Sequence, residues 1–458
     1  FFERRNPTVT LLWIMVLMFL PGVGFILYLF LGQDLSKKKM FEIKEKEDEY
    51  YKNMITNQYK DIDDGIFHKM NPNFYRYEDL IRMQLRSSKS YYTHNNEVDI
   101  YFNGDDKFEA LLESIKKAED YIYIQYYIFK SDGIGNKIID ELIKKANEGV
   151  EVKFLVDGMG GRNLSRKAKK RMKENGIDVA IFFPPFVPLV SVRINYRNHR
   201  KLCVIDGKVG FVGGFNVGDE YLGLYKKFGH WRDTHIKIVG SAVASLQWRF
   251  YLDWRFASRT ELKANRSYLH DNEIEGKAGI QIVSSGPDSK WPSVKDGYLK
   301  LISDAKKKLY IETPYFIPDD SMFEALRLAA LSGVDVRVMI PNKPDHIFVY
   351  WAGLSYIGEL LQAGVRFFTY ENGFLHSKVF ISDDYVSSVG TANLDIRSFE
   401  LNFEVNAFVY DKDVNKKLTD NFLKDLEICQ EITKEKYANR SLIIKIKESF
   451  SRLLSPIL

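Results

Sequence analysis

Cysteine is scarce in this chain, which limits the chemistry open to it. The two cysteines among 458 residues, Cys203 and Cys429, have the spacing of neither a zinc site nor a disulfide framework. Cys203 lies in an apolar run, so we expect a buried free thiol, which is typical of a reducing compartment. No group of carboxylates has the spacing of metal ligands either. The sequence therefore predicts no metal and no other cofactor.

The chain also lacks a strong excess of one charge. It has 66 Lys and Arg against 61 Asp and Glu, a formal net charge of +5 at pH 7. Nucleic-acid-binding proteins usually concentrate basic charge far more heavily, so we expect no nucleic-acid partner. The length of 458 residues suffices for two or three domains with a sizeable core.

One long apolar run is present, at residues 11–32. It is nearly uncharged and long enough to cross a bilayer once. Pro21-Gly22-Val23-Gly24 interrupts it, and such a break either kinks a spanning helix or produces a re-entrant hairpin. Lysines cluster between residues 37 and 46, so positive-inside counting predicts that the bulk of the chain is cytoplasmic. Since the chain begins with Phe1 rather than Met, we expect the natural N-terminus to lie upstream.

The following chain repeats an alternation of helix and strand patterns. An amphipathic helix pattern begins at Phe108, and then come a β-rich run at 121–129, a helix at 134–146 and a strand at 150–156. The same order returns at residues 294–305, 309–316, 321–330 and 334–340. A shift of 187 positions aligns Leu112 with Leu299 and Tyr123 with Tyr310. We therefore predict an internal duplication, with two copies of roughly 160 residues packed as a pseudo-symmetric pair.

A histidine–lysine motif occurs once in each copy. Both occurrences read His-x-Lys-x4-Asp, and an Asn follows each His by 17 positions. A single motif of this kind is a weak signal, whereas two with the same following Asn are a strong one. The first set is His199, Lys201, Asp206 and Asn216, and the second is His376, Lys378, Asp383 and Asn393.

These residue types suit reaction at a phosphodiester. Alternate residues of a β-strand share a face, so the His and Lys of each motif should point the same way. One neutral His can attack phosphorus to give a phosphohistidine, while the other, protonated, donates to the leaving oxygen. The lysines and the two asparagines would hold the non-bridging oxygens. Asp206 and Asp383 complete the predicted catalytic group, although each closes a strand at a turn, so a structural role is an open alternative.

Two further carboxylates are candidates for orienting the histidines. Asp233 and Glu404 each open an alternating strand pattern downstream of a motif. A carboxylate that holds the second nitrogen of an imidazole is what such a mechanism needs. The alternative for both residues is an ordinary surface salt bridge.

The pair of motifs resembles the signature of the phospholipase D superfamily, and the closer resemblance is to bacterial cardiolipin synthases. The blocks that carry the resemblance are residues 198–201, 213–221, 231–233, 253–254, 390–398 and 402–404. The apolar N-terminal segment and residues 452–456 fit as well. The resemblance therefore runs nearly from end to end.

This resemblance implies an α/β fold, with two pseudo-symmetric phospholipase D-like α/β/α sandwich domains after an N-terminal transmembrane or re-entrant segment. It implies a phosphatidyltransferase of the bacterial cell membrane with a cytoplasmic catalytic domain. In that family two phosphatidylglycerols give cardiolipin and glycerol through a phosphatidyl-histidine, usually on the first motif. His199 is then the nucleophile and His376 the acid and base, although the opposite assignment stays open. Phosphatidylglycerol and anionic membrane lipid are the implied partners, and a homo-oligomer is compatible with the sequence.

We expect six segments along the chain. They are a membrane segment (1–36), a charged helical linker (37–95), the first catalytic half (96–258), a linker (259–277), the second catalytic half (278–433) and a basic amphipathic tail (434–458). The tail either lies on an anionic membrane or packs on the body. A Pro-rich stretch at 182–190 is either a lip that dips into lipid or a packed loop. Arg193, Arg197 and Arg200 either attract anionic headgroups or form a solvated basic face.

Three reactions would use the same chemistry. They are phosphatidyl transfer between two phosphatidylglycerols, hydrolysis or transphosphatidylation of other phospholipids by a membrane-bound phospholipase D, and cleavage of nucleic acid. The apolar segment favours lipid, and the balanced charge argues against nucleic acid. A non-enzymatic membrane scaffold with a degenerate duplication conflicts with two intact motifs.

Overall fold

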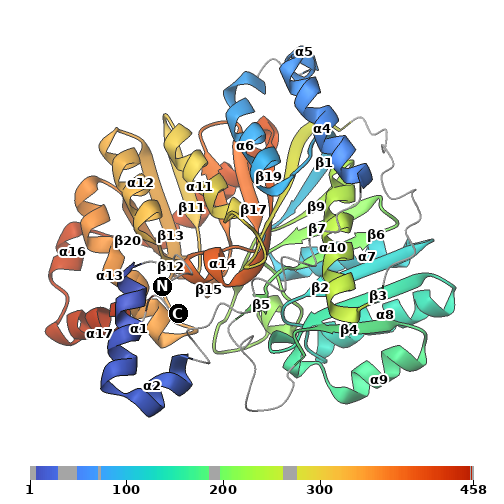
Figure 1. Ribbon diagram of the computed structural model, residues 1–458, viewed down its shortest axis with the longest axis horizontal. Coiled ribbons are helices and arrows are strands. Elements are labelled where there is room, and N and C mark those ends of the chain that lie inside the picture. Colours follow the sequence, from blue (N-terminus) through green and yellow to red (C-terminus); the bar gives the residue numbers. More distant parts are fainter. Residues whose placement is uncertain are drawn as a thin grey trace.

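Within the residues that the structure describes, a mixed β-sheet of 16 strands lies at the centre and is covered by helices (Figure 1). The structure, a computed structural model, describes residues 7–28, 49–70, 74–184, 196–260, 276–453 and 455. The fold is of the mixed α/β class, as the sequence predicts.

The first half of the sheet alternates helices and strands. Its elements are β1 (Tyr92–Tyr101), α7 (Gly104–Lys116), β2 (Tyr121–Tyr126), α8 (Gly133–Asn147), β3 (Glu151–Asp157), α9 (Arg166–Glu174), β4 (Asp178–Phe182), β5 (Arg197–Asn198), β6 (Leu202–Ile205), β7 (Val209–Gly213), β8 (Trp231–Arg232), β9 (His235–Gly240) and α10 (Ala242–Ser258).

The second half repeats this series and adds a C-terminal extension. Its elements are β10 (Ala278–Ser285), α11 (Ser293–Asp304), β11 (Lys308–Glu312), β12 (Phe316–Ile317), α12 (Asp320–Leu331), β13 (Asp335–Pro341), α13 (Ile347–Ala363), β14 (Arg366–Tyr370), β15 (Phe374–Leu375), β16 (Val379–Ser382), β17 (Val386–Gly390), β18 (Leu394–Asp395), α14 (Ile396–Glu400), β19 (Asn402–Tyr410) and α15 (Lys412–Leu426). The extension consists of β20 (Cys429–Ile432), α16 (Lys434–Ala438) and α17 (Leu442–Leu453).

The two halves have matching strand orders. The first runs β4-β3-β2-β6-β7-β9-β1 and the second β14-β13-β11-β16-β17-β19-β10, with β20 beside β14. The halves meet where β1 and β10 pair in antiparallel fashion, with Tyr92 opposite Gln281. The duplication predicted from the sequence thus appears as two copies of one topology. They share a single hydrogen-bonded sheet rather than forming two separate sandwiches.

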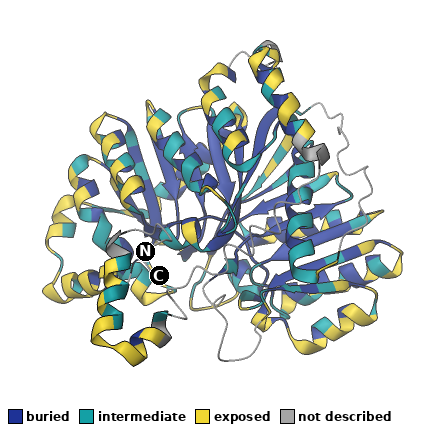
Figure 2. Ribbon diagram, viewed as in Figure 1, coloured by how far each residue is buried: buried dark blue, intermediate teal, exposed yellow. Residues whose placement is uncertain are grey.

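Three apolar clusters attach the helices to the sheet. One joins α7 and α8 to the strands of the first half, and a second joins α6 (Glu78–Ser88), α11, α12 and α13 to the second half. The third contains side chains of α10, α15 and strands from both halves, among them Phe250 and Leu418. Figure 2 shows the buried sheet and the exposed outer faces of the helices. Burial of one apolar face stabilises helices that would be marginal alone.

The N-terminal apolar run forms two short helices, α1 (Pro7–Phe19) and α2 (Pro21–Leu27). The chain breaks at Leu20, and Pro21 occupies the first turn of α2, where its missing N–H is tolerated. The predicted interruption is therefore confirmed. In the part of the chain that the structure describes, no helix is both long and apolar enough to cross a membrane. Residues 29–48, with the whole lysine cluster between 37 and 46, lie outside the described residues.

Part of the predicted linker belongs to the folded body. α4 (Glu49–Asp63) and α5 (Ile66–Met70) precede α6. Leu80, Ile81 and Leu85 of α6 are fully buried in the cluster of the second half, and β1 begins at Tyr92. The body therefore begins before residue 96, because the apolar face of α6 packs on the second half, far along the sequence.

A buried arginine of the first motif fastens the two halves together. Arg200 is 1% exposed. Its Nη1 donates to Asp253 Oδ1 (2.7 Å), its Nε to the carbonyl oxygen of Glu404 (3.1 Å) and its Nη2 to that of Ser285 (3.1 Å). Arg200 therefore belongs neither to a solvated basic face nor to a headgroup site, and both predicted roles are wrong for it.

Arg232 makes a second buried connection of this kind. Its Nε donates to Asp425 Oδ2 (2.7 Å) and its Nη2 to Glu312 Oε1 (3.1 Å), both in the second half. All three side chains are buried or nearly so. Because such pairs lie away from water, loss of one partner leaves an uncompensated charge.

We predict that Arg232→Leu lowers the free energy of unfolding by about 3–5 kcal/mol, because Asp425 and Glu312 lose their shared cation. Denaturant unfolding of the detergent-solubilised protein measures the change. Lys416→Leu, which removes an exposed ion pair with Asp420, is the control and should leave the transition in place. Coincident transitions for the two variants would contradict the prediction.

Candidate active site

Two very short strands cross from one half of the protein to the other. β5 pairs in parallel with the start of β19, Asn198 opposite Phe403, and β8 pairs in parallel with β15, Arg232 opposite Leu375. Each exchange seats a motif histidine on the opposite half. The backbone N–H of His199 donates to Phe403 (3.0 Å), and that of His376 donates to Arg232 (2.7 Å).

The strand exchange pairs each motif histidine with a carboxylate from the other half. His199 Nδ1 lies 3.0 Å from both Glu404 Oε1 and Oε2. His376 Nδ1 lies 2.7 Å from Asp233 Oδ2. With Nδ1 donating to the carboxylate, the lone pair of each ring is on Nε2. The predicted orienting contacts of Asp233 and Glu404 are thus present, and each crosses between the halves.

The two carboxylates differ in their surroundings. Glu404 also accepts from Thr391 Oγ1 (2.6 Å) and Asn402 Nδ2 (3.2 Å). Burial opposes its ionisation, but the interaction with His199, the Lys201 charge and the Thr391 hydrogen bond together outweigh this and lower the pKa of Glu404. Asp233 accepts from the Thr234 backbone N–H (2.7 Å). Burial raises the pKa of Asp233 to about 6, against the opposing charge of Lys378.

Both histidines favour the neutral form in the free protein. Burial lowers the pKa of His199 to about 4, although Glu404 opposes the shift. Burial, followed by the charges of Lys378 and Lys201, places the pKa of His376 well below its ordinary value. His199 also contributes to that lowering, so the groups of the two motifs act on each other at short range.

The two motif lysines are fully buried beside the histidines. Lys201 Nζ donates to the backbone oxygen of His199 (2.5 Å), and Lys378 Nζ donates to that of His376. Burial lowers the pKa of Lys201 to about 7 and that of Lys378 to about 8, while Glu404 and Asp233 oppose both shifts. Two lysines with depressed pKa values make an environment that favours a bound anion.

The two motif asparagines lie in the turns that follow β7 and β17. Asn216 Oδ1 accepts from the Ile128 backbone N–H (3.0 Å). Asn393 Nδ2 donates to Asp395 Oδ2 (3.1 Å), and its Oδ1 is buried without a hydrogen bond in the part of the chain that the structure describes. Burial raises the pKa of Asp395 to about 6. Both asparagines are buried.

Comparison with known proteins places this geometry in a family. Residues 111–228 and 298–426 match a family model described as a cardiolipin synthase, phospholipase D-like domain. Residues 1–33 match one described as a phospholipase D-nuclease N-terminal domain. The chain is 51% identical over 458 residues to a cardiolipin synthase of Oceanobacillus iheyensis, covering all of this chain and 95% of that protein. It is 50% identical over 459 residues to the major cardiolipin synthase ClsA of Bacillus subtilis, with the same coverage.

The chain belongs to the cardiolipin synthase family. Its fold also resembles that of a phosphatidylserine synthase from Haemophilus influenzae, with a TM-score of 0.62 over 83% of this chain and all of the other. A polyphosphate kinase from Porphyromonas gingivalis gives a TM-score of 0.51 over 78% of this chain. At 16% and 13% sequence identity, these two likenesses concern the fold alone.

In this cardiolipin synthase family member, the aspartates of the motifs lie at turns beyond the far ends of β6 and β16. Asp206 accepts from the backbone N–H groups of residues 119–121 at 2.8–2.9 Å. Asp383 accepts from those of residues 306–308 at 2.8–3.2 Å. Both have positive φ, +53° and +46°. Each carboxylate closes the turn before β2 or β11, which fits the structural alternative rather than the catalytic one.

The motif histidines and lysines lie between short strands rather than within one. Residues 199–201 connect β5 to β6, and residues 376–378 connect β15 to β16. The prediction of a strand is wrong at these positions. There the chain stops pairing with a strand of the opposite half and begins pairing with strands of its own half. The extended segment still presents each His and Lys to one cluster.

The sequence pattern does not predict two contributors to this cluster, Tyr127 and Thr391. The Tyr127 ring lies 5.0 Å from the imidazole of His199 and 5.4 Å from Lys201 Nζ. Thr391, which bonds Glu404, has Gly214 as its counterpart in the first motif. A Cβ at Gly214 would come within 1.9 Å of Asp233 Oδ1, so only glycine fits there. The sequence signal for Thr391 is a difference between the two copies: Gly214-Phe215 precede Asn216, whereas Thr391-Ala392 precede Asn393.

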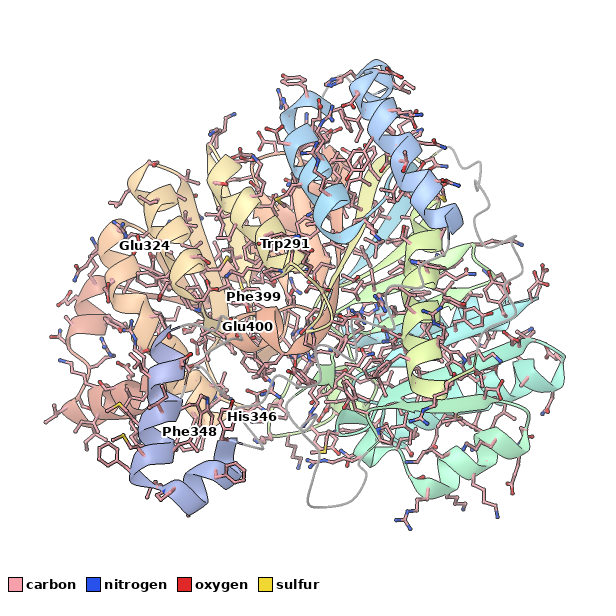
Figure 3. The ribbon with its side chains drawn as sticks, viewed as in Figure 1. Trp291, Glu324, His346, Phe348, Phe399 and Glu400 are labelled. Carbon is pink, nitrogen blue, oxygen red and sulfur yellow. The ribbon has the colours of Figure 1, made fainter. Side chains whose placement is uncertain are left out.

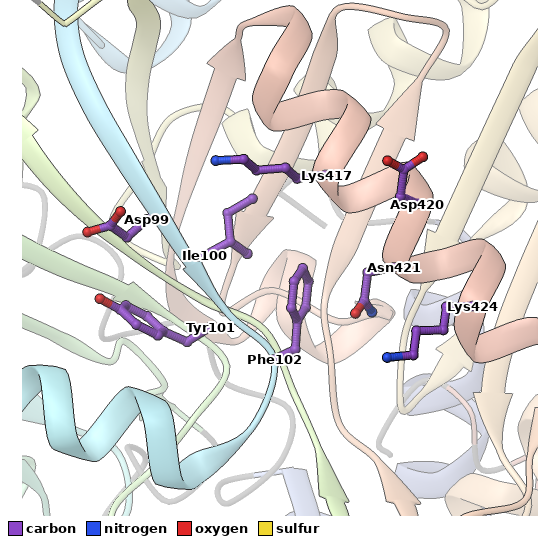
Figure 4. A pocket seen from close by; sticks show the side chains of 8 residues that line it. All are labelled: Asp99, Ile100, Tyr101, Phe102, Lys417, Asp420, Asn421 and Lys424. Carbon is purple, nitrogen blue, oxygen red and sulfur yellow. The ribbon is translucent and has the colours of Figure 1, made fainter.

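Other predicted features fall outside this cluster or outside the described residues. The described residues contain no group of three or more His, Cys, Asp or Glu that could hold a metal ion. A surface groove of about 700 Å³, lined by residues 99–102 and by Lys417, Asp420, Asn421 and Lys424, contains none of the motif residues (Figure 4).

Most of the Pro-rich stretch and Arg193 lie within residues 185–195, which are not described. Phe182, where that stretch begins, is buried against Phe403.

We predict that Asp206→Ala lowers the free energy of unfolding by about 2–3 kcal/mol, because three backbone N–H groups lose a charged acceptor. Turnover per folded molecule should stay unchanged. Asp206→Asn keeps an acceptor and tolerates positive φ, so it should fall between the wild type and Asp206→Ala in stability. If Asp206→Ala lost turnover but kept its full stability, Asp206 would instead have a catalytic role.

Proposed function

We propose that the protein transfers a phosphatidyl group between two phosphatidylglycerol molecules, giving cardiolipin and releasing glycerol. The carrying observation is the reciprocal pairing of His199 with Glu404 and of His376 with Asp233. Because this pairing uses Nδ1 of each histidine, the two Nε2 atoms are free to react at one phosphate bound between the halves. Whole-chain identity of about 50% to cardiolipin synthases supports this choice of reaction.

His199 is the nucleophile in this proposal. Glu404, whose pKa is lowered, stays ionised across the physiological range and can balance the positive charge that forms on the His199 ring. Asp233, with a pKa of about 6, is a weaker counterion for His376. Because a ring that becomes covalently phosphorylated needs the firmer counterion, the unequal carboxylates favour His199.

The first step breaks the bond between phosphorus and the glycerol headgroup oxygen. His199 Nε2 attacks phosphorus as that bond breaks, and protonated His376 gives its Nε2 proton to the departing oxygen. His376 is neutral in the free protein, but the negative phosphate raises its pKa when substrate binds. The products of this step are glycerol and a phosphatidyl group on His199.

The second step returns the enzyme to its starting state. A hydroxyl of the second phosphatidylglycerol attacks phosphorus, and neutral His376 accepts its proton. The new bond from oxygen to phosphorus replaces the bond to His199 Nε2. Cardiolipin leaves, and both histidines recover the protonation states with which they began the cycle at the bound phosphate.

The charge on the phosphoryl oxygens is balanced by the protein in this scheme. Lys201 and Lys378 supply positive charge in a site away from water, where it acts strongly. Asn216 and Asn393 are proposed as ligands of the same oxygens. We propose that the reaction requires no metal ion, since these four side chains provide the electrostatic role that a metal would otherwise supply.

Lipid specificity follows from membrane attachment in this proposal. Residues 1–36 would hold the protein at the bacterial cell membrane, with the catalytic body on the cytoplasmic side. The exposed apolar side chains of α1 support attachment, because Leu11, Met18 and Phe19 are 60%, 77% and 74% exposed. The basic residues between 37 and 46 support the orientation.

We predict that the purified protein in phosphatidylglycerol vesicles forms cardiolipin and releases one glycerol per cardiolipin, and that excess EDTA does not slow it. Lipid mass spectrometry together with an enzymatic glycerol assay measures both products. A His199→Ala preparation is the control for contaminating activity. Phosphatidic acid as the main product would contradict the proposal and indicate a phospholipase D that uses water.

We predict a bell-shaped pH dependence of kcat/KM for phosphatidylglycerol. Asp233 must be ionised to hold His376, so activity falls below about pH 6. Lys201 and Lys378 lose their charge as pH rises through about 7 and 8, so activity also falls on the alkaline side. The kcat profile should extend to higher pH, because bound phosphate raises both lysine pKa values.

Lys201→Arg tests the alkaline limb, because guanidinium keeps its charge throughout this range. The limb should move to higher pH in this variant, whatever the loss in absolute rate. An alkaline limb that stays at the same pH in Lys201→Arg would assign it to another group.

A further inference from the structure

Helix α17 carries an apolar stripe on its outer side. Its exposed large apolar side chains, each between 58% and 78% exposed, are Leu442, Ile443, Ile446, Phe450 and Leu453. At about 100° per residue these positions fall within about 100° of the helix circumference, so they form one stripe. A helix on a soluble body normally turns such a stripe toward the core. An apolar stripe left outward marks an interaction surface.

The opposite side of α17 attaches the helix to the body. Glu448 is buried there. Lys447 Nζ lies 5.3 Å from the ring centre of Trp351, and the Arg452 guanidinium lies 4.6 Å from that of Tyr356, both in α13. Cation–π contacts and buried polar groups therefore hold the helix in place. The apolar stripe is left without a partner in the part of the chain that the structure describes.

Basic side chains lie beside this stripe. Lys445 borders one edge of the stripe on α17, and Lys447, whose Nζ lies over Trp351, borders the other edge; both lysines are exposed. Neither lysine takes part in an ion pair within the described residues, and Glu448, the acidic residue of α17, is buried on the other side of the helix. An apolar stripe bordered by exposed lysines is the pattern of a helix that lies in the headgroup region of an anionic leaflet.

The same surface continues to the catalytic cluster through α13. Ile347 and Phe348, at the start of α13, are 62% and 51% exposed. Figure 3 shows Phe348 beside His346, at the opposite end of the second half from Glu324 of α12. Asp345, two residues before α13, accepts a hydrogen bond from Tyr315, and its charge acts on His376. The exposed start of α13 therefore borders the catalytic residues.

We propose that α17 and the start of α13 form one docking surface, which seats in the anionic leaflet of a bilayer and sets the catalytic cluster against lipid. The inference rests on the proposed function, since the substrate is a lipid of that leaflet. A lipid surface is the occupant because lysines border the stripe, and because α17, at 12 residues, is too short to span. Seating by this surface fixes the height of the active site above the acyl chains.

Nitroxide labels in the full chain, reconstituted in phosphatidylglycerol vesicles, test the docking. Ile446→Cys and Phe450→Cys place labels on the stripe, and Lys170→Cys on exposed α9 is the control. Cys429→Ser supplies the background, because Cys203 is fully buried. The stripe labels should collide more with oxygen than with a water-soluble nickel chelate, and the control should show the reverse. In phosphatidylcholine vesicles the stripe labels should lie closer to water.

The label experiment also separates the other occupants. Spin–spin broadening at Ile446→Cys would show a second copy of the chain on the stripe. Low collision with both oxygen and the nickel chelate would show that the chain itself covers it. Either result, or a stripe as open to the chelate as Lys170→Cys, would overturn the proposal.

Activity on two forms of substrate distinguishes docking from chemistry. The double variant Ile446→Asp/Phe450→Asp should turn over vesicle phosphatidylglycerol at least about fivefold more slowly. On short-chain phosphatidylglycerol dispersed below its micelle concentration, it should match the wild type. Leu423→Asp on α15, at a position 40% exposed, is the matched control and should change neither rate.

Equal losses on both substrates would overturn the docking proposal, because α17 would then support the fold or the site. Wild-type protein that forms no cardiolipin from either substrate would instead overturn the proposed function. The label depths decide the docking surface in that case too, so the two failures stay distinguishable.

Discussion

The active site depends on one reciprocal arrangement, in which each motif histidine is held by a carboxylate of the other half. The contacts, His199 to Glu404 and His376 to Asp233, are 2.7–3.0 Å long and buried. Hydrogen bonds to ionised groups in such surroundings are strong and fix the ring orientation. Neither half contains a complete site. The shared sheet, the cluster between α10 and α15 and the buried arginines all serve to keep the two halves in register.

The duplication is close in topology but unequal in chemistry. Thr391 bonds Glu404, whereas its counterpart Gly214 leaves room for Asp233. The motif position of Arg200 is Ser377 in the second copy, and there the guanidinium comes from Arg232, across the exchange. The two motif histidines are therefore chemically alike but lie in different electrostatic surroundings. This difference allows one of them to act as nucleophile and the other as acid and base.

The sequence predicted the parts of the fold that depend on local pattern. Helix α8 and strand β13 lie within one residue of the expected ranges, because their apolar periodicity is continuous and tertiary contacts only reinforce it. The paired motifs, and Asp233 and Glu404 as partners of the histidines, followed from residue type and repetition. The buried thiol of Cys203 followed from the apolar run around it.

The parts that escaped prediction depend on contacts distant in sequence. β5 and β8 are two residues each, too short to carry any periodicity, yet they decide which carboxylate meets which histidine. The sequence predicts a linker at α6, because the core partners of this helix lie about 200 residues later in the chain. The sequence predicts a surface cation at Arg200, because its buried partner Asp253 lies 53 positions away and leaves no local signal.

The identity of the phosphorylated histidine tests the account most directly. His376→Ala protein is incubated with phosphatidylglycerol and digested, and the peptides carrying each motif are analysed by mass spectrometry under conditions that preserve phosphohistidine. We predict a phosphatidyl adduct on His199 in this variant and none in His199→Ala. An adduct on His376 in His199→Ala, with none on His199 in the other variant, would contradict it.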